Sequence, residues 1–229
     1  MKVISEEVFC EINDSIILNS PNIVDLGILH GKMGVVIYLY IYSRYSQKEY
    51  YADFASILLD GILSELDVSL SFSFESGLSG IGWGIEYLIQ NKYLDGDTSE
   101  ILSDIDLIVM KNQDIRRIND WSFKKGISGL VLYTFTRLTS FARNQNKYPF
   151  DELYLSEMLN NITQFDYCDM PCYVKNILLS FKEYMIKPYT LFNSINIPKY
   201  MYCGGGELEK SKLGILGGMA GYGLMHILK

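Results

Sequence analysis

A glycine turn that recurs at a near-constant interval limits the fold of this sequence more than any other feature. Four copies read Gly-x-x-Gly, and they begin at Gly31, Gly77, Gly126 and Gly218. Their first glycines are 46, 49 and 92 residues apart, and 92 is twice 46. The doubled interval predicts a further copy near position 172, where an apolar stretch opens at Val174 without glycines. Self-similarity of this kind indicates a repeat architecture, so we count five repeats, the fourth of them degenerate.

Each repeat is predicted to hold an outer helix that mixes charged residues with apolar ones at helical spacing. The outer helices are expected at residues 49–67, 98–112 and 150–163. Capping-box spacings precede two of them, in Ser46 with Glu49 and in Asp97 with Glu100. In the first two helices the apolar face is expected to hold Phe54, Ile57, Leu58, Ile62, Ile101, Ile105 and Ile108.

The inner helix of each pair is predicted to begin at the glycine turn, near Gly34, Gly80, Gly129, Val174 and Gly221. Residues 35–42 are apolar or aromatic on every face, as in a helix enclosed by neighbours. A buried strand is the alternative for so β-prone a stretch. The helical periodicity of the equivalent residues 84–90 and 175–182 favours a helix.

Two explanations fit the recurring glycines. Glycine permits unusual backbone angles at the turn and lets helix starts approach closely, which is a structural role. The free backbone N–H groups at such helix starts could instead hold an anion, which would be a functional role.

Composition excludes some classes of protein. The 229 residues carry a net charge of -7, which argues against a nucleic-acid partner because phosphates are bound by clustered Lys and Arg. The chain has no stretch of about 18 uncharged apolar residues, and its first residues reach acidic side chains before any apolar run of signal-peptide length. We therefore expect one domain over residues 1–229, without a membrane span, in the cytoplasm.

Three of the glycine segments, residues 26–34, 76–84 and 213–221, resemble the glycine repeats of the lanthionine synthetase C-like (LanC-like) family. The resemblance implies an α/α toroid, in which an outer ring of helices surrounds an inner ring. Family members have seven helix pairs and this chain supplies about five, so it implies an arc or an incomplete ring. Whether a second chain completes the ring stays open.

In the family, a zinc ion held by two Cys and one His activates peptide thiols for addition to dehydrated Ser or Thr. The family ligands stand in the one or two positions before the first glycine of late repeats. Those positions here hold Leu29-His30, Glu75-Ser76, Lys124-Lys125, Met170-Pro171 and Leu216-Gly217, without a cysteine. We therefore predict no zinc cofactor there.

The cysteines themselves are expected to be buried or bound to metal. Cys168, Cys172 and Cys203, with His30, contain the donor types for a rearranged zinc site. Pro171 interrupts the turn between the first two, and nothing in the sequence sets their distances to the others.

The same positions supply the candidate binding residues His30, Glu75, Lys124 and Lys125, which are predicted to surround one mouth where the inner helices begin. Solvated surface charges explain Glu75, Lys124 and Lys125 equally well. His30 is also the candidate for acid–base chemistry, or a histidine that hydrogen-bonds its turn. On the second inner helix, Trp83 is expected to be a core residue, and Glu86 accompanies it.

The function predicted from these features is a peptide-binding accessory, or a partner of a modification enzyme, in peptide modification of the lanthipeptide type. One alternative is an active cyclase or thiol-handling enzyme with a rearranged metal site. Another is a toroid glycosidase, which needs two carboxylates, and Glu75 alone occupies a suitable repeat position.

Overall fold

The computed structural model describes residues 5–67, 69–111, 115, 118–144, 149–164, 170–188, 201 and 210–228, with side chains of 141–144 excepted. All regular secondary structure in these residues is helical, which confirms the all-α prediction. Contacts divide the chain into two compact units. Unit 1 spans Met1–Leu70, Glu75–Gly77 and Asn196–Lys229, and unit 2 spans Ser71–Phe74 and Leu78–Ile195. Within the described ranges, no helix has the length and apolar character needed to cross a membrane.

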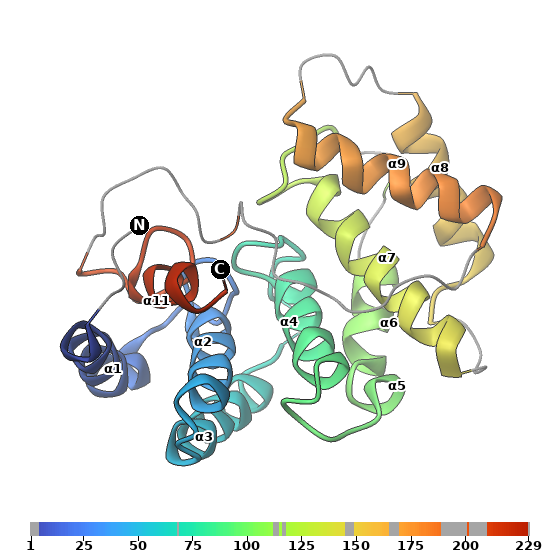
Figure 1. The fold of residues 1–229 in the computed structure, drawn as a ribbon. Coiled ribbons are helices and arrows are strands. Elements are labelled where there is room, and N and C mark those ends of the chain that lie inside the picture. The colour runs from blue at the N-terminus through green and yellow to red at the C-terminus, as the bar shows by residue number, and fades with distance from the viewer. Residues whose placement is uncertain are drawn as a thin grey trace. The chain divides into compact units, whose positions relative to one another are not determined.

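Unit 1 is built around a helix that is buried on every face. Its elements are α1 (Glu6–Asn19), η1 (Ser20–Asn22), α2 (Lys32–Ser46), α3 (Tyr50–Ser64) and α11 (Met219–Ile227) (Figure 1). Helix α2 packs against α3 and α11, and α11 also contacts α1. Residues 33–43 are buried without a break, so the helical interpretation of 35–42 is confirmed.

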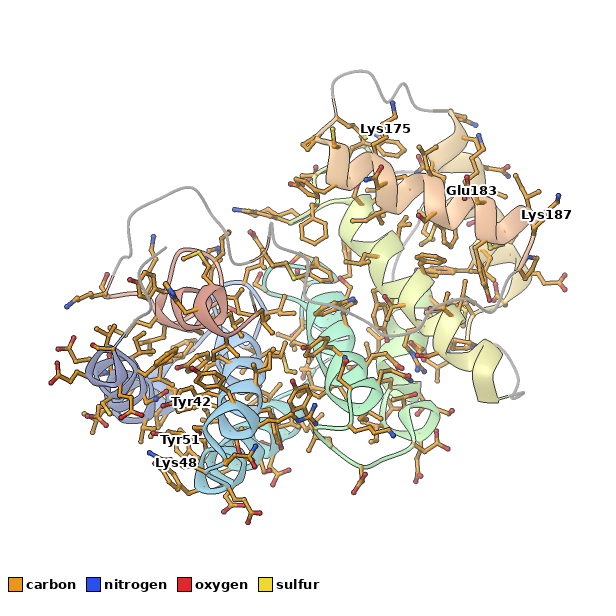
Figure 2. All side chains as sticks on the ribbon, in the orientation of Figure 1. Tyr42, Lys48, Tyr51, Lys175, Glu183 and Lys187 are labelled. Atoms are coloured by element: carbon orange, nitrogen blue, oxygen red, sulfur yellow. The ribbon has the colours of Figure 1, made fainter. Side chains whose placement is uncertain are left out.

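Aromatic rings fill the space around α2. Tyr42 of α2 meets Tyr51 of α3 edge to face, with ring centroids 4.9 Å apart (Figure 2). The Tyr38 hydroxyl donates to Oδ1 of Asn13 on α1 over 2.8 Å, which gives this buried hydroxyl the partner it needs.

Unit 2 contains α4 (Leu78–Gln90), α5 (Thr98–Ile101), α6 (Ser103–Lys111), α7 (Ile127–Asn144), α8 (Glu152–Thr163) and α9 (Cys172–Ile186). Helix α7 packs against α4 and α9, while α6 packs on α4 and α8 on α9. The inner helices α2, α4, α7, α9 and α11 begin at most two residues before the predicted starts. Trp83 is a core residue, as predicted, stacked on Tyr87 at 5.5 Å.

Several local predictions are wrong. Ser46 is the last residue of α2, and α3 has Glu49 at its N-cap without a side-chain cap bond, so the first capping box does not form. The helix predicted at 98–112 is interrupted at Leu102 and forms α5 and α6. Ile57 and Ile101, assigned to apolar inner faces, are exposed. Periodicity could not exclude them, because exposed isoleucine is common on helices.

Two of the four cysteines lie in the described residues, and both contradict the expectation of burial. Cys10 on α1 and Cys172 at the start of α9 are exposed free thiols. Cys172 follows Pro171, the N-cap of α9, and so stands in the first turn of that helix.

Candidate functional site

The glycine turns belong to longer loops with one common backbone geometry. In each loop the N–H of the first helical residue donates to the carbonyl seven residues earlier. These bonds are Lys32 to Asp25, Leu78 to Ser71 and Ile127 to Asp120, each 2.8 Å, and Met219 to Lys212, 2.9 Å. We call the four segments 25–32, 71–78, 120–127 and 212–219 the glycine loops.

Three glycine loops also begin with the same side-chain cap. The first residue accepts a hydrogen bond from the backbone N–H two residues later, as Asp and Ser do in tight turns. The pairs are Asp25 with Gly27 at 2.7 Å, Ser71 with Ser73 at 3.0 Å, and Asp120 with Ser122 at 2.8 Å. The loop 212–219 begins with Lys212, whose ammonium can only donate hydrogen bonds and so cannot form this cap, but the loop keeps the backbone geometry.

Close packing explains the two glycines of the first, third and last glycine turns. A Cβ on Gly31 would lie under 3.0 Å from the Asp25 carbonyl, and one on Gly34 would do the same at the Ile28 carbonyl. The equivalent clashes recur at Gly126, Gly129, Gly218 and Gly221. The expectation of unusual backbone angles is wrong at Gly31 and Gly218, where φ is -106°. Glycine is needed there because the loop carbonyl leaves no room for a side chain.

Backbone hydrogen bonds join neighbouring glycine loops. In unit 1, Leu29 N–H donates to the Glu75 carbonyl over 3.0 Å, and Leu216 N–H donates to the Leu29 carbonyl over 2.8 Å. In unit 2, Phe74 N–H donates to the Lys124 carbonyl over 2.9 Å. The last glycine loop in the chain therefore lies directly against the first.

A pocket of about 410 Å³ lies in unit 1 beside the contact between the first and last glycine loops. Its lining comes from the end of α1, from η1 and the residue after it, from both loops and from the residue before the last loop. The lining residues are Asn19, Asn22, Ile23, His30, Ser211, Lys212, Leu213 and Gly214. Two of these side chains can carry positive charge, and none of the described lining residues is acidic.

The four candidate binding residues all lie in glycine loops. His30 is exposed and lines the pocket, and Glu75 is half-buried in the loop that bonds to Leu29. Lys124 and Lys125 are exposed in unit 2. The structure thus brings the segments that hold His30 and Glu75, both residues of unit 1, next to each other. A mouth shared by all four residues stays a prediction.

The rearranged zinc site also stays untested. Cys168 and Cys203 lie outside the described residues, and Cys172 is exposed. Within the part of the chain that the structure describes, no three His, Cys, Asp or Glu side chains are grouped so that they could hold a metal ion.

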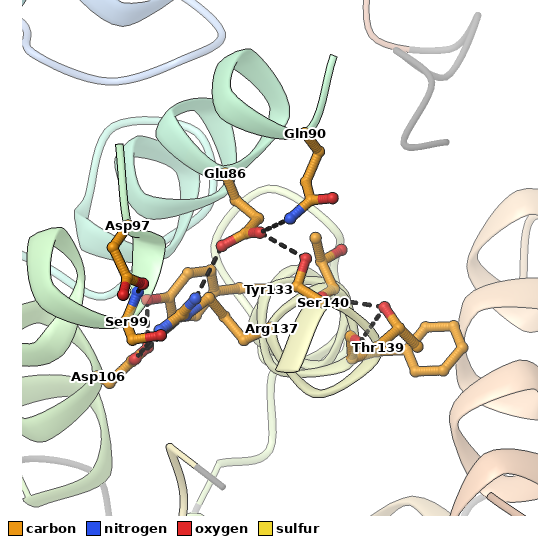
Figure 3. A network of polar contacts seen from close by, with 11 residues as sticks. Glu86, Gln90, Asp97, Ser99, Asp106, Tyr133, Arg137, Thr139 and Ser140 are labelled. Atoms are coloured by element: carbon orange, nitrogen blue, oxygen red, sulfur yellow. Dashed lines mark hydrogen bonds and ion pairs between the residues drawn. The ribbon is translucent and has the colours of Figure 1, made fainter. Parts of the chain in front are cut away.

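Sequence reasoning missed a buried ionic network in unit 2 (Figure 3). The Arg137 guanidinium donates to Glu86 Oε2 over 2.8 Å and to Asp106 Oδ2 over 2.6 Å. Tyr133 donates to Asp106 Oδ1 and Ser140 to Glu86 Oε1, each over 2.5 Å. All five side chains are buried, so the network ties α4, α6 and α7 together away from solvent.

Burial also sets the ionisation of this network. Desolvation raises the pKa of the Asp106 carboxyl, and the hydrogen bond and charge of Arg137 act in the opposite direction. Burial likewise raises the pKa of Tyr133 well above its ordinary value, so its phenol stays protonated and donates. Tyr133, Arg137 and Ser140 are spaced four and three residues apart on α7. This spacing puts the three polar side chains on one face of the helix, and it was the sequence signal that could have revealed the network.

Comparisons of this chain with models of protein families, with curated proteins and with solved structures find no match.

Proposed function

We propose that this chain is a LanC-like helical repeat protein that binds a peptide, as an accessory to the maturation of modified peptides, and lacks the zinc chemistry of the cyclases. The observation that carries the proposal is the backbone contact between the first and last glycine loops, Leu216 N–H to the Leu29 carbonyl. In a toroid the last repeat is the neighbour of the first, so this contact supports an α/α ring or arc of helix pairs.

The residue types in the glycine loops favour binding over cyclisation. The two positions before each first glycine hold no thiol, and neither Leu nor Lys replaces a thiolate as a zinc ligand. They do hold His30, Glu75, Lys124 and Lys125, which can form hydrogen bonds and ion pairs with a peptide. We assign these four residues to peptide binding.

The buried network gives no support to a glycosidase. Its carboxylates, Glu86 and Asp106, are sealed from solvent and both bonded to Arg137. A glycosidase needs its two carboxyl groups on either side of a bound sugar.

The test uses the full chain and a precursor peptide that contains cysteine and dehydrated serine. Fluorescence anisotropy measures binding, metal analysis measures zinc, and mass spectrometry after alkylation counts the remaining peptide thiols. We expect binding without loss of thiols. Stoichiometric zinc together with thiol consumption would establish the cyclase instead, and a peptide that does not bind would refute the accessory role.

Two variants test the assignment of these residues to peptide binding. Glu75→Ala and Lys124→Ala are expected to weaken peptide binding with little change in thermal stability, since truncation of polar side chains that are not buried usually has little effect on folding. As a contrast, Ile85→Ala and Leu178→Ala remove buried side chains and should destabilise the fold by about 2–5 kcal/mol. Unchanged affinity in both polar variants would remove these residues from the site.

A further inference from the structure

We propose that the pocket beside His30 binds the carboxylate of an acidic side chain, presented by a peptide segment in which an aliphatic residue stands next to it. This inference rests on the proposed function for the ligand being a peptide. It names the chemistry by which one part of unit 1 would recognise that peptide.

Charge gives the first argument. The chain has 27 acidic and 20 basic residues, yet the described pocket lining contains Lys212 and His30 and no carboxylate. Ammonium groups form charge-assisted hydrogen bonds with carboxylates. Two side chains that can carry positive charge, with no carboxylate among the described lining residues, favour an anionic ligand group.

The other polar lining groups fit the same ligand. Asn19, Asn22 and Ser211 contribute amide and hydroxyl groups, which can donate hydrogen bonds to carboxylate oxygens. Ile23 and Leu213 add aliphatic surface to the lining. A site with cationic, donor and aliphatic parts matches an acidic residue beside an aliphatic one.

The walls of the pocket are held by bonds that do not depend on a ligand. The Lys212 carbonyl accepts the Met219 N–H over 2.9 Å, which fixes the backbone from which the ammonium extends. Gly214 packs so closely on the first glycine loop that a Cβ there would lie 2.6 Å from His30 Cα. At the end of α1, Asn19 Nδ2 donates to the Ser15 carbonyl over 2.7 Å.

A pocket whose backbone is already ordered loses little conformational freedom when it binds. Its volume of about 410 Å³ also falls within the range of roughly 300–1,000 Å³ that is typical of ligand sites. One side chain and the backbone on either side of it fit such a volume.

The test measures fluorescence anisotropy of a labelled peptide of about ten residues that contains Glu-Leu pairs, with the full-length protein. A second peptide replaces every Glu by Gln, which keeps size and shape but removes the charge. Hydrogen bonds to charged groups are the stronger ones, so the Glu peptide should bind about tenfold more tightly. Equal affinities for the two peptides would overturn the proposal.

Variants locate the binding. Lys212→Met removes the charge and keeps the aliphatic stem, and it should lower affinity for the Glu peptide about tenfold, with recovery in Lys212→Arg. His30→Gln should lower it severalfold. Lys48→Met is the matched control, since Lys48 is an exposed lysine of unit 1 outside the pocket lining (Figure 2). Equal losses in Lys212→Met and Lys48→Met would indicate general attraction to the surface and refute the site.

The outcomes also separate this inference from the proposed function. A precursor peptide that binds with the same affinity whether its acidic residues are Glu or Gln refutes the carboxylate pocket and leaves the accessory role standing. Zinc-dependent loss of peptide thiols refutes the accessory role, while a Glu preference that Lys212→Met abolishes still supports the pocket. Thermal unfolding of each variant confirms that it is folded.

Discussion

Arg137 lies in an environment that its charge would not suggest. Its side chain is fully buried, and it faces the carboxylates of Glu86 and Asp106. Isolated charges in an apolar interior are strongly unfavourable, so each member of this group depends on the others. The network therefore holds α4, α6 and α7 together. Removal of one of its charged side chains leaves the remaining buried charges without compensation.

We expect Arg137→Met to destabilise the native state by about 3–5 kcal/mol at pH 7, because it leaves two buried carboxylates without their cation. Urea unfolding of the variant and of the unaltered protein measures the difference. Lys175→Met provides the control, since Lys175 is exposed on α9 of the same unit (Figure 2). A loss below about 1 kcal/mol would contradict the assigned role.

The cost of Arg137→Met should be smaller at pH 5 than at pH 7. Burial raises the pKa of Asp106 above its ordinary value of 3.8, and loss of Arg137 removes a group that lowers it. A carboxyl whose pKa is higher in the folded than in the unfolded state stabilises the fold below the unfolded pKa, and this stabilisation is lost as the pH rises through the folded pKa. Urea unfolding curves of the variant and of the unaltered protein at both pH values test whether the loss of stability is smaller at pH 5.

At the scale of elements, the glycine loops define how each inner helix begins. The bond from the first helical N–H to the carbonyl seven residues earlier satisfies a donor that every helix start otherwise leaves free. The same compact loop brings the Ile28 carbonyl against Gly34. The glycine spacing thus follows from the loop and does not by itself identify a ligand site.

Two glycine substitutions with opposite expected effects on stability test this explanation. Gly34→Ala places a Cβ against the Ile28 carbonyl and should destabilise the protein by about 1–3 kcal/mol. Gly61→Ala in α3 has open space around its Cβ and should stabilise by about 0.5–1 kcal/mol through higher helix propensity. Thermal unfolding measures both, and a neutral Gly34→Ala would show that the loop can relax around the added methyl.

At the scale of the molecule, unit 1 is assembled from distant parts of the chain. Helix α11 packs on α2 and α1, and Gly223 of α11 lies so close to the Tyr38 ring that a Cβ would clash with it. Tyr38 is completely buried and bonded to Asn13. The C-terminal helix is therefore part of the core that encloses α2.

A chain that ends at Glu209 should lose this core, because truncation removes α11 and the last glycine loop. Hydrogen exchange followed by mass spectrometry should show faster exchange in α2, with α7 of unit 2 remaining protected. Unchanged protection of α2 would mean that α11 contributes little to unit 1.

The all-α class, the five inner-helix starts and the buried character of 35–42 could be predicted from the sequence alone. These features follow from interactions between residues a few positions apart, where hydrophobic periodicity carries information. Outer-helix details were less predictable. Ser46 had the right spacing for a cap but continues α2, and Leu102 interrupts a stretch that reads as continuous.

The residues of the candidate site, too, could be predicted only in part. His30 could be named from its place in a repeated motif, whereas its pocket partners Asn19, Asn22 and Lys212 show no motif at all. Arg137 lies 51 residues from Glu86 and 31 from Asp106, so tertiary packing alone decided that they would meet. Local patterns specify where helices form. Which helix surfaces face each other depends on long-range burial and hydrogen bonding, and the spacing of residues in the sequence carries no information about these.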